Sequence, residues 1–137
     1  MSKVETLLAR MSLQEKVGQL NLAPAGQAVT GPSGSGDIMA NICAGDVGGV
    51  FNLWGREAVA AMQKVAVEET RLGAPLFFAL DVLHGFETIF PVPLAEASAF
   101  DPALWEATAR AAATEAAGEG IDLTFAPMID ICRDPRW

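Results

Sequence analysis

Two long apolar runs in the second half of the chain have the pattern of strands that are buried on both faces. The first covers residues 75–81, and the second covers 123–131 with Pro127 interrupting it. Shorter runs at 47–53 and 19–23 predict two further strands. The glycines in the run at 47–53 indicate close packing or a bend. Continuous apolar runs of this length are typical of parallel sheets, which are covered on both faces.

Three segments between these runs show helical periodicity. Ser12 and Glu15 have the spacing of a capping box, in which each side chain accepts a hydrogen bond from the backbone of the other. Asp101 and Pro102 mark the N-cap and first turn of an alanine-rich helix that ends at one of two glycines near residue 120. The apolar positions that share one helix face are Leu13, Val17 and Leu20 in the first segment, and Val59, Met62, Val65 and Ala66 in the helix at 56–71.

The order of these elements predicts an α/β fold with parallel strands. Residues 24–36 are rich in Gly, Ser and Pro, and predict a loop within one domain because an ordered pattern resumes on both sides. About four strand-and-helix units follow one another, which implies right-handed crossovers between parallel strands. A closed eight-fold barrel needs about 250 residues. The pattern therefore fits half of such a barrel or a small open sheet with helices on both faces.

Composition limits the classes of function. Of the 137 residues, 51% are hydrophobic, which excludes a disordered chain, and the formal net charge is -8. This charge argues against nucleic-acid and anionic-membrane partners. No apolar run is long enough to span a bilayer, and the first residues lack the apolar core of a secretory signal. Cys43 and Cys132 match no zinc-ligand spacing and are expected to be small buried side chains.

Asp81 is the strongest functional candidate in the chain. It ends a predicted buried strand, and carboxylates at the C-terminal ends of parallel strands are where α/β folds place ligand groups. Asp81, His84 and Glu87 are spaced three apart, which on a helix would align them as metal ligands. Gly85 and the preceding strand argue against a helix, so no metal site is predicted. His84 is expected to pack in a loop and to bond backbone through one ring nitrogen.

Six short motifs then occur in a fixed order along the chain. They are MSLQEKVGQL at 11–20, GGVFN at 48–52, ALDVLHG at 79–85, TIFP at 88–91, FAPM at 125–128 and RDPRW at 133–137. Together, from about Leu7 to the last residue, they resemble the N-terminal barrel domain of glycoside hydrolase family 3, in particular its bacterial periplasmic β-glucosidase type. The resemblance implies that residues 1–137 form the N-terminal half of a TIM-like (β/α)8 barrel.

The resemblance also implies a substrate and a role for one residue. In the family, the aspartate that matches Asp81 binds hydroxyls of the terminal non-reducing glucose of a β-glucoside or oligosaccharide. The enzymes hydrolyse that glucosyl bond with retention and need no cofactor. Their nucleophile, their acid/base and a sugar-binding Lys-His pair would all lie beyond Trp137. The sequence therefore contains no predicted catalytic residue, and the chain alone is expected to be inactive.

Several details leave alternatives open. Glu87 stands where relatives of this type often carry an arginine, so the local charge beside Asp81 is reversed. Either the sugar contact is made differently, or Glu87 pairs with a basic side chain. Trp54, after a strand, is a candidate for sugar stacking at the barrel mouth, whereas Trp105 is expected in the core. The residues expected to shape the last loop through internal ion pairs and turn bonds are Arg133, Asp134 and Arg136.

The function itself has two rivals. A β-xylosidase of the same family would use the same half-barrel, whereas the sequence around Asp81 disfavours a β-N-acetylglucosaminidase. The half-barrel could instead be an inactive assembly or binding fragment, because two unpaired strand edges favour self-association. The resemblance favours a periplasmic or secreted location.

Overall fold

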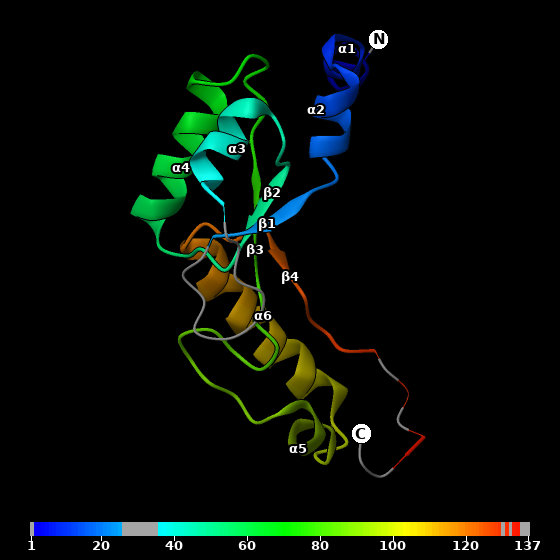
Figure 1. The fold of residues 1–137 in the computed structure, drawn as a ribbon. Helices are drawn as coiled ribbons and strands as arrows, with labels where there is room; N and C mark the ends of the chain where they lie inside the picture. Colours follow the sequence, from blue (N-terminus) through cyan, green and yellow to red (C-terminus); the bar gives the residue numbers. More distant parts are fainter. Residues whose placement is uncertain (1, 26–35, 130, 132, 135–137) are drawn as a thin grey trace.

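The computed structural model describes residues 2–25, 36–129, 131, 133 and 134 (Figure 1). Within them, four parallel strands pair in chain order as one sheet. The strands are β1 (Leu22–Pro24), β2 (Gly49–Phe51), β3 (Phe77–Leu80) and β4 (Leu123–Thr124). In the register, Phe51 stands opposite Ala79, which in turn stands opposite Leu123. The predicted parallel α/β organisation is confirmed, although each strand is shorter than its apolar run.

In the described part of the chain, two helices precede β1, and the other four lie in the connections between the strands. The predicted ones are α2 (Leu13–Gly18), α4 (Arg56–Glu68) and α6 (Pro102–Gly118), and those that the periodicity did not predict are α1 (Lys3–Arg10), α3 (Ile38–Ala44) and α5 (Pro93–Ala97). Ser12 and Glu15 form the predicted capping box, and Asp101 caps α6 by accepting a hydrogen bond from the backbone N–H of Ala103. Among the described residues, no helix is long and apolar enough to cross a bilayer.

The core lies between the sheet and the helices that follow its strands. Val50 and Phe78 are fully buried on the helix side of β2 and β3. The predicted face of α4 packs on them through Val59, Met62 and Ala66, with Val65 partly buried beside these. Because side chains alternate along a strand, the neighbours Phe51, Phe77 and Ala79 point to the opposite side. This second side is the inner face of the sheet.

The glycines of 47–53 pack closely, as predicted. A side chain at Gly49 would meet the ring of Phe77 at 2.6 Å, and one at Gly48 would meet the backbone of Gln19 at 2.5 Å. These two contacts leave no room for a Cβ atom. The sequence of β2 is therefore set by its neighbours on both edges.

Three expectations were wrong. The predicted strand at 123–131 pairs only at its first two residues, and Ile129 is 87% exposed. The described sheet offers this segment a partner on one side only, and Pro127 has no N–H to donate. Cys43 is exposed, since Ile42 takes the buried position of α3. Trp105 is 39% exposed, because it lies in the first turn of α6 and its indole N–H donates to the Glu96 carbonyl of the small helix α5.

Some predicted features lie outside the described residues. They are most of the loop at 24–36, together with Cys132, Arg136 and Trp137. The apolar face of α2 is present but is not covered by any other described element. Leu13 and Val17 on this face and Leu20 in the turn after it have exposed fractions of 78%, 61% and 87%.

Candidate functional site

Asp81 directly follows β3 and is exposed, whereas its neighbours Leu80 and Val82 are both buried. By the alternation along the strand, Asp81 lies on the same inner face as Phe77 and Ala79. Within the described residues, its carboxylate has no hydrogen-bond or ion-pair partner. A rigid backbone thus presents a free acceptor at the C-terminal end of the sheet.

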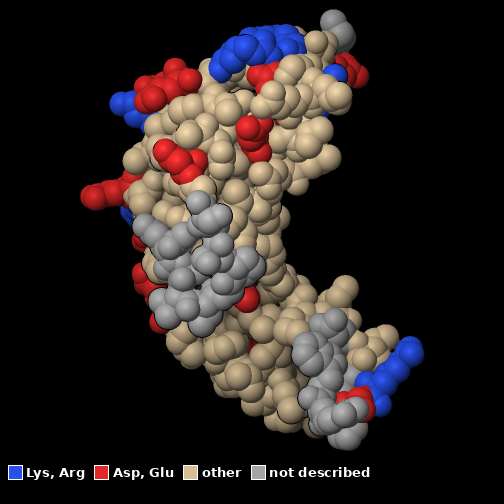
Figure 2. Space-filling view, in the orientation of Figure 1, with Lys and Arg blue, Asp and Glu red and all other residues tan. Residues whose placement is uncertain are grey.

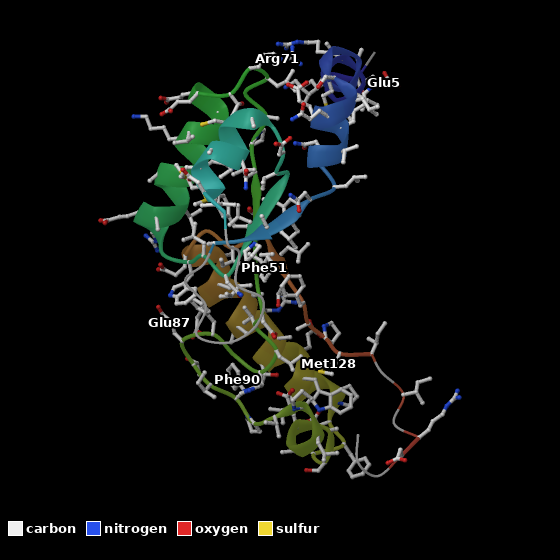
Figure 3. The ribbon with its side chains drawn as sticks, viewed as in Figure 1. Glu5, Phe51, Arg71, Glu87, Phe90 and Met128 are labelled. Carbon is white, nitrogen blue, oxygen red and sulfur yellow. The ribbon has the colours of Figure 1, made fainter. Side chains whose placement is uncertain are left out.

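Two aromatic rings lie on the same inner face, at the strand ends that Asp81 follows. Phe51 at the end of β2 and Phe125 just after β4 meet edge to face, with ring centroids 6.4 Å apart. The strand between them is β3, where the small Ala79 stands opposite Phe51 on one side and opposite Leu123, two positions before Phe125, on the other. Hydrogen bonding continues past the strand ends, from Phe125 N to the Leu80 carbonyl at 3.4 Å. The aromatic pair therefore lies across the end of β3, and continuing the register places Phe125 opposite Asp81. Figure 3 shows Phe51 where the strands end.

The loop after Asp81 closes on itself. Phe90 donates its N–H to the His84 carbonyl at 2.7 Å, and the ring Nδ1 of His84 lies 3.1 Å from the Phe90 carbonyl oxygen. Gly85 and Ile89 form an antiparallel bridge inside this closure. The expectation that His84 packs in a loop and bonds backbone through one ring nitrogen is confirmed. No cluster of three or more His, Cys, Asp or Glu side chains with metal-binding geometry occurs among the described residues.

The tip of this loop is attached to α6 by Glu115. The carboxylate of Glu115 accepts hydrogen bonds from the N–H groups of Glu87 and Thr88 at 3.0 and 2.9 Å. The Thr88 hydroxyl donates to its second oxygen at 2.6 Å. The hydrogen bonds from Thr88 are the main cause that lowers the pKa of Glu115. The Glu87 side chain itself is exposed and points away from the sheet in Figure 3, without a basic partner among the described residues.

Trp54 follows β2 at the same end of the sheet as Asp81. Asn52 donates its N–H to the Ala79 carbonyl at 3.1 Å, so the segments that leave β2 and β3 start side by side. Trp54 is 44% exposed, which leaves part of its ring accessible. Of the two secondary candidates, Trp54 is thus placed at the strand ends and Glu87 on the outer side of the loop.

The opposite end of the sheet carries a different arrangement. A cavity of about 240 Å³ lies there between α2, α3 and the segment before β3. Glu15 and Arg71, which line it, are bound to each other by an ion pair. No buried polar side-chain atom of the described residues lacks a hydrogen-bond partner. In barrels this N-terminal end serves stability, whereas ligands bind at the C-terminal end, which favours the Asp81 end as the site.

Sequence reasoning missed three residues of the candidate site: Phe51, Phe125 and Glu115. Phe51 and Phe125 lie inside the predicted strands at 47–53 and 123–131, and only the shorter strands of the structure bring both rings to the strand ends. Glu115 is separated from Thr88 by 27 positions and sits in an alanine-rich helix. No pattern in the sequence marks that contact.

Comparison with known proteins identifies the family. Residues 12–137 match the family described as "Glycosyl hydrolase family 3 N terminal domain". The chain is 42% identical to a periplasmic beta-glucosidase of Salmonella typhimurium, over 98% of this chain and 17% of that protein. It is 30% identical to a putative beta-xylosidase of Formosa agariphila, over 98% of this chain and 20% of that protein.

Solved structures agree with this relationship. A beta-glucosidase from Listeria innocua, in complex with isofagomine, superposes with a TM-score of 0.84 at 34% identity and covers 100% of this chain and 19% of its own. The chain thus spans about a fifth of the length of the relatives it matches. Its parallel strands and helices form the N-terminal half of a TIM-like (β/α)8 barrel, and the chain belongs to glycosyl hydrolase family 3.

Proposed function

We propose that this chain supplies the sugar-binding carboxylate of a retaining β-glucosidase, which releases terminal non-reducing β-D-glucosyl residues. The observation that carries the proposal is the carboxylate of Asp81, without a partner among the described residues, at the C-terminal end of β3 and on the same sheet face as the rings of Phe51 and Phe125. A carboxylate can accept hydrogen bonds from two adjacent sugar hydroxyls, and such charge-assisted bonds are strong. Aromatic rings offer an apolar surface to the C–H face of a pyranose.

The reaction needs more than this half-barrel supplies. Retention requires two carboxyl groups about 5–5.5 Å apart, one as nucleophile and one as acid/base. We place both in polypeptide outside residues 1–137 and assign no catalytic residue to this chain. Trp54 is proposed as a secondary contact to the substrate, and Glu87 as a weaker one because its side chain points outward. The higher identity to a β-glucosidase than to a putative β-xylosidase favours glucose, and that relative's name favours the periplasm.

A glucose titration followed by NMR tests the role of Asp81. The wild-type chain should show glucose-dependent shifts at Asp81, Phe51 and Phe125. Asp81→Asn should raise the dissociation constant roughly tenfold or more, because a hydrogen bond to a charged group contributes about 1.5–3 kcal/mol. Asp101→Asn removes the same charge but keeps an N-cap residue on α6, so it should bind glucose like the wild type. Equal affinities for both variants would refute the assignment.

An activity assay tests where the reaction centre lies. Purified chain with an intact mass near 14.4 kDa should not hydrolyse an aryl β-glucoside. Turnover at that mass would mean that the carboxyl pair lies within these residues, and the proposal would be wrong. A longer polypeptide that contains this sequence should release glucose.

Self-association of the isolated half-barrel is a second proposal, favoured by its strand edges. Within the described residues, β1 pairs only with β2 and β4 only with β3. Placing β4 of one copy beside β1 of a second copy would continue the same parallel order toward eight strands. Figure 2 shows a concave side with few charged side chains, which suits contact with another molecule. Light scattering should give about twice 14.4 kDa, and a monomer at high concentration would contradict this.

A further inference from the structure

Glu115 is the described link between the tip of the loop after β3 and helix α6. Both of its carboxylate oxygens accept hydrogen bonds, one from the N–H groups of Glu87 and Thr88 and the other from the Thr88 hydroxyl. The three donors come from two consecutive residues, so they fix both the position and the direction of the loop tip. A carboxylate suits this task because it carries acceptors on two oxygens and no donor.

The loop between His84 and Phe90 is closed by its own contacts, so its tip and its base are expected to move together. Its base is joined by the Phe90–His84 backbone hydrogen bond of 2.7 Å, and Gly85 packs so closely that a Cβ atom would lie 2.0 Å from the Thr88 carbonyl oxygen. Only Val82 and Leu83 separate Asp81 from this closed segment. A displacement of the tip would reach Asp81 through these two residues, of which Val82 is buried in the core, while β3 holds the other side.

We propose that Glu115 is a positioning residue for the Asp81 site, which orients the Asp81 carboxylate toward a bound sugar by fixing the loop tip to α6. The inference rests on the proposed function, since it assigns Glu115 a role in the same sugar site. The low pKa of Glu115 agrees with a carboxylate that stays charged while it accepts these hydrogen bonds. Glu115 does not touch the sugar in this arrangement and acts through the loop.

The experiment measures loop order and glucose affinity separately on the 137-residue chain. Amide hydrogen exchange reports the N–H of Thr88, the NMR shift of the Asp81 carboxyl carbon reports its surroundings, and glucose titration reports affinity. Glu115→Gln keeps the shape but replaces one acceptor oxygen with a donor. We expect roughly tenfold faster exchange at Thr88, a moved Asp81 signal and roughly tenfold weaker glucose binding.

Matched variants separate positioning from general stability. Thr88→Val removes the hydroxyl donor and should change the same three signals in the same direction, whereas Thr88→Ser keeps the donor and should restore them. Glu106→Gln changes an exposed glutamate on the same helix, whose one ion-pair partner among the described residues is Arg110, and should change none of them. Thr88→Val also decides the question if Glu115→Gln does not fold.

Each failure points to a different error. Unchanged exchange at Thr88 in Glu115→Gln would show that the attachment does not hold the loop. Faster exchange without any change at the Asp81 carboxyl carbon would limit Glu115 to tethering and overturn the positioning role. If the wild-type chain does not bind glucose, the sugar site is refuted, while the Asp81 signal still decides whether Glu115 orients that carboxylate.

Discussion

Arg71 and Glu15 form an ion pair that joins the segment before β3 to helix α2. The guanidinium donates to both carboxylate oxygens of Glu15, with Nε 2.9 Å from Oε1, and also donates to the Arg10 carbonyl at 2.9 Å. Figure 3 shows Arg71 reaching toward the N-terminal helices. Glu15 is 9% exposed and is itself part of the α2 capping box through Ser12. One carboxylate thus serves a local cap and a contact between distant segments.

This pair predicts an acid-dependent loss of stability. The hydrogen bond from Arg71, followed by that from the Ser12 N–H, lowers the pKa of Glu15 from 4.5 to about 2. The folded value lies below the unfolded one, so the stabilisation is complete above about pH 4.5 and declines as the pH falls toward 2. We expect Glu15→Gln to have a lower Tm than the wild type at pH 7, with a difference that shrinks below pH 4.5.

Thermal unfolding followed by circular dichroism across this pH range measures the difference. Glu106→Gln removes a glutamate from an exposed pair and should leave the Tm nearly unchanged at every pH. A Tm difference for Glu15→Gln that is equal at pH 7 and pH 2.5 would contradict the assignment.

Phe78 should be the most sensitive position of the sheet. Its ring is 1% exposed, between β3 and the helices. Phe78→Ala should lower the free energy of unfolding by about 3–5 kcal/mol, because it leaves a cavity in a packed core. Phe100 is 89% exposed, so Phe100→Ala should change it by less than about 0.5 kcal/mol. Urea unfolding measures both, and similar values for the two variants would contradict the described core.

Gly85 and Gly55 allow backbone strain to be separated from crowding. Both have positive φ angles, 115° and 96°, but a Cβ atom at Gly55 would meet nothing within 4 Å, whereas one at Gly85 would meet the Thr88 carbonyl oxygen. Gly55→Ala should therefore destabilise the chain only by its backbone conformation, about 1–3 kcal/mol. Gly85→Ala should destabilise it further and disorder the loop after Asp81. Equal unfolding free energies would show that the loop is less tightly closed than described.

The aromatic pair on the inner face can be tested by a double-mutant cycle. Phe51→Leu and Phe125→Leu should each destabilise the sheet, and the double variant should show a coupling energy of about 0.5–1.5 kcal/mol. Adding glucose should stabilise the wild type more than any of these variants if the rings also contact sugar. A coupling energy near zero would indicate that the edge-to-face contact contributes nothing beyond burial.

The sequence predicted the fold where one residue pattern decides the local structure. The apolar run before Asp81 becomes β3, and Asp101 with Pro102 starts α6, because burial and capping act over a few neighbouring residues. The extent of the last strand was misjudged, since Ile129 and its neighbours are apolar but find no strand to pair with among the described residues. Helix α1 was missed although Ser2 and Glu5 form a capping box like that of α2.

The candidate site shows the same division. The position of Asp81 at a strand end could be predicted, because the apolar run before it stops at this residue. The role of Glu115 could not be predicted, because its contact with Thr88 depends on how α6 packs beside the loop. The environment of Cys43 was also unpredictable, since a shift of one position around α3 decides whether Ile42 or Cys43 is buried.

The two faces of β3 differ in how freely their residues can be exchanged. Phe78 and Leu80 face the helices, where almost any change opens a cavity or creates a clash. Ala79 and Asp81 face the inner side, where Ala79 is fully buried between its neighbours whereas Asp81, just past the strand end, is exposed. Of these positions only Asp81 can therefore be exchanged without removing or crowding a buried side chain, so the scaffold and the surface at the strand end can change independently of each other.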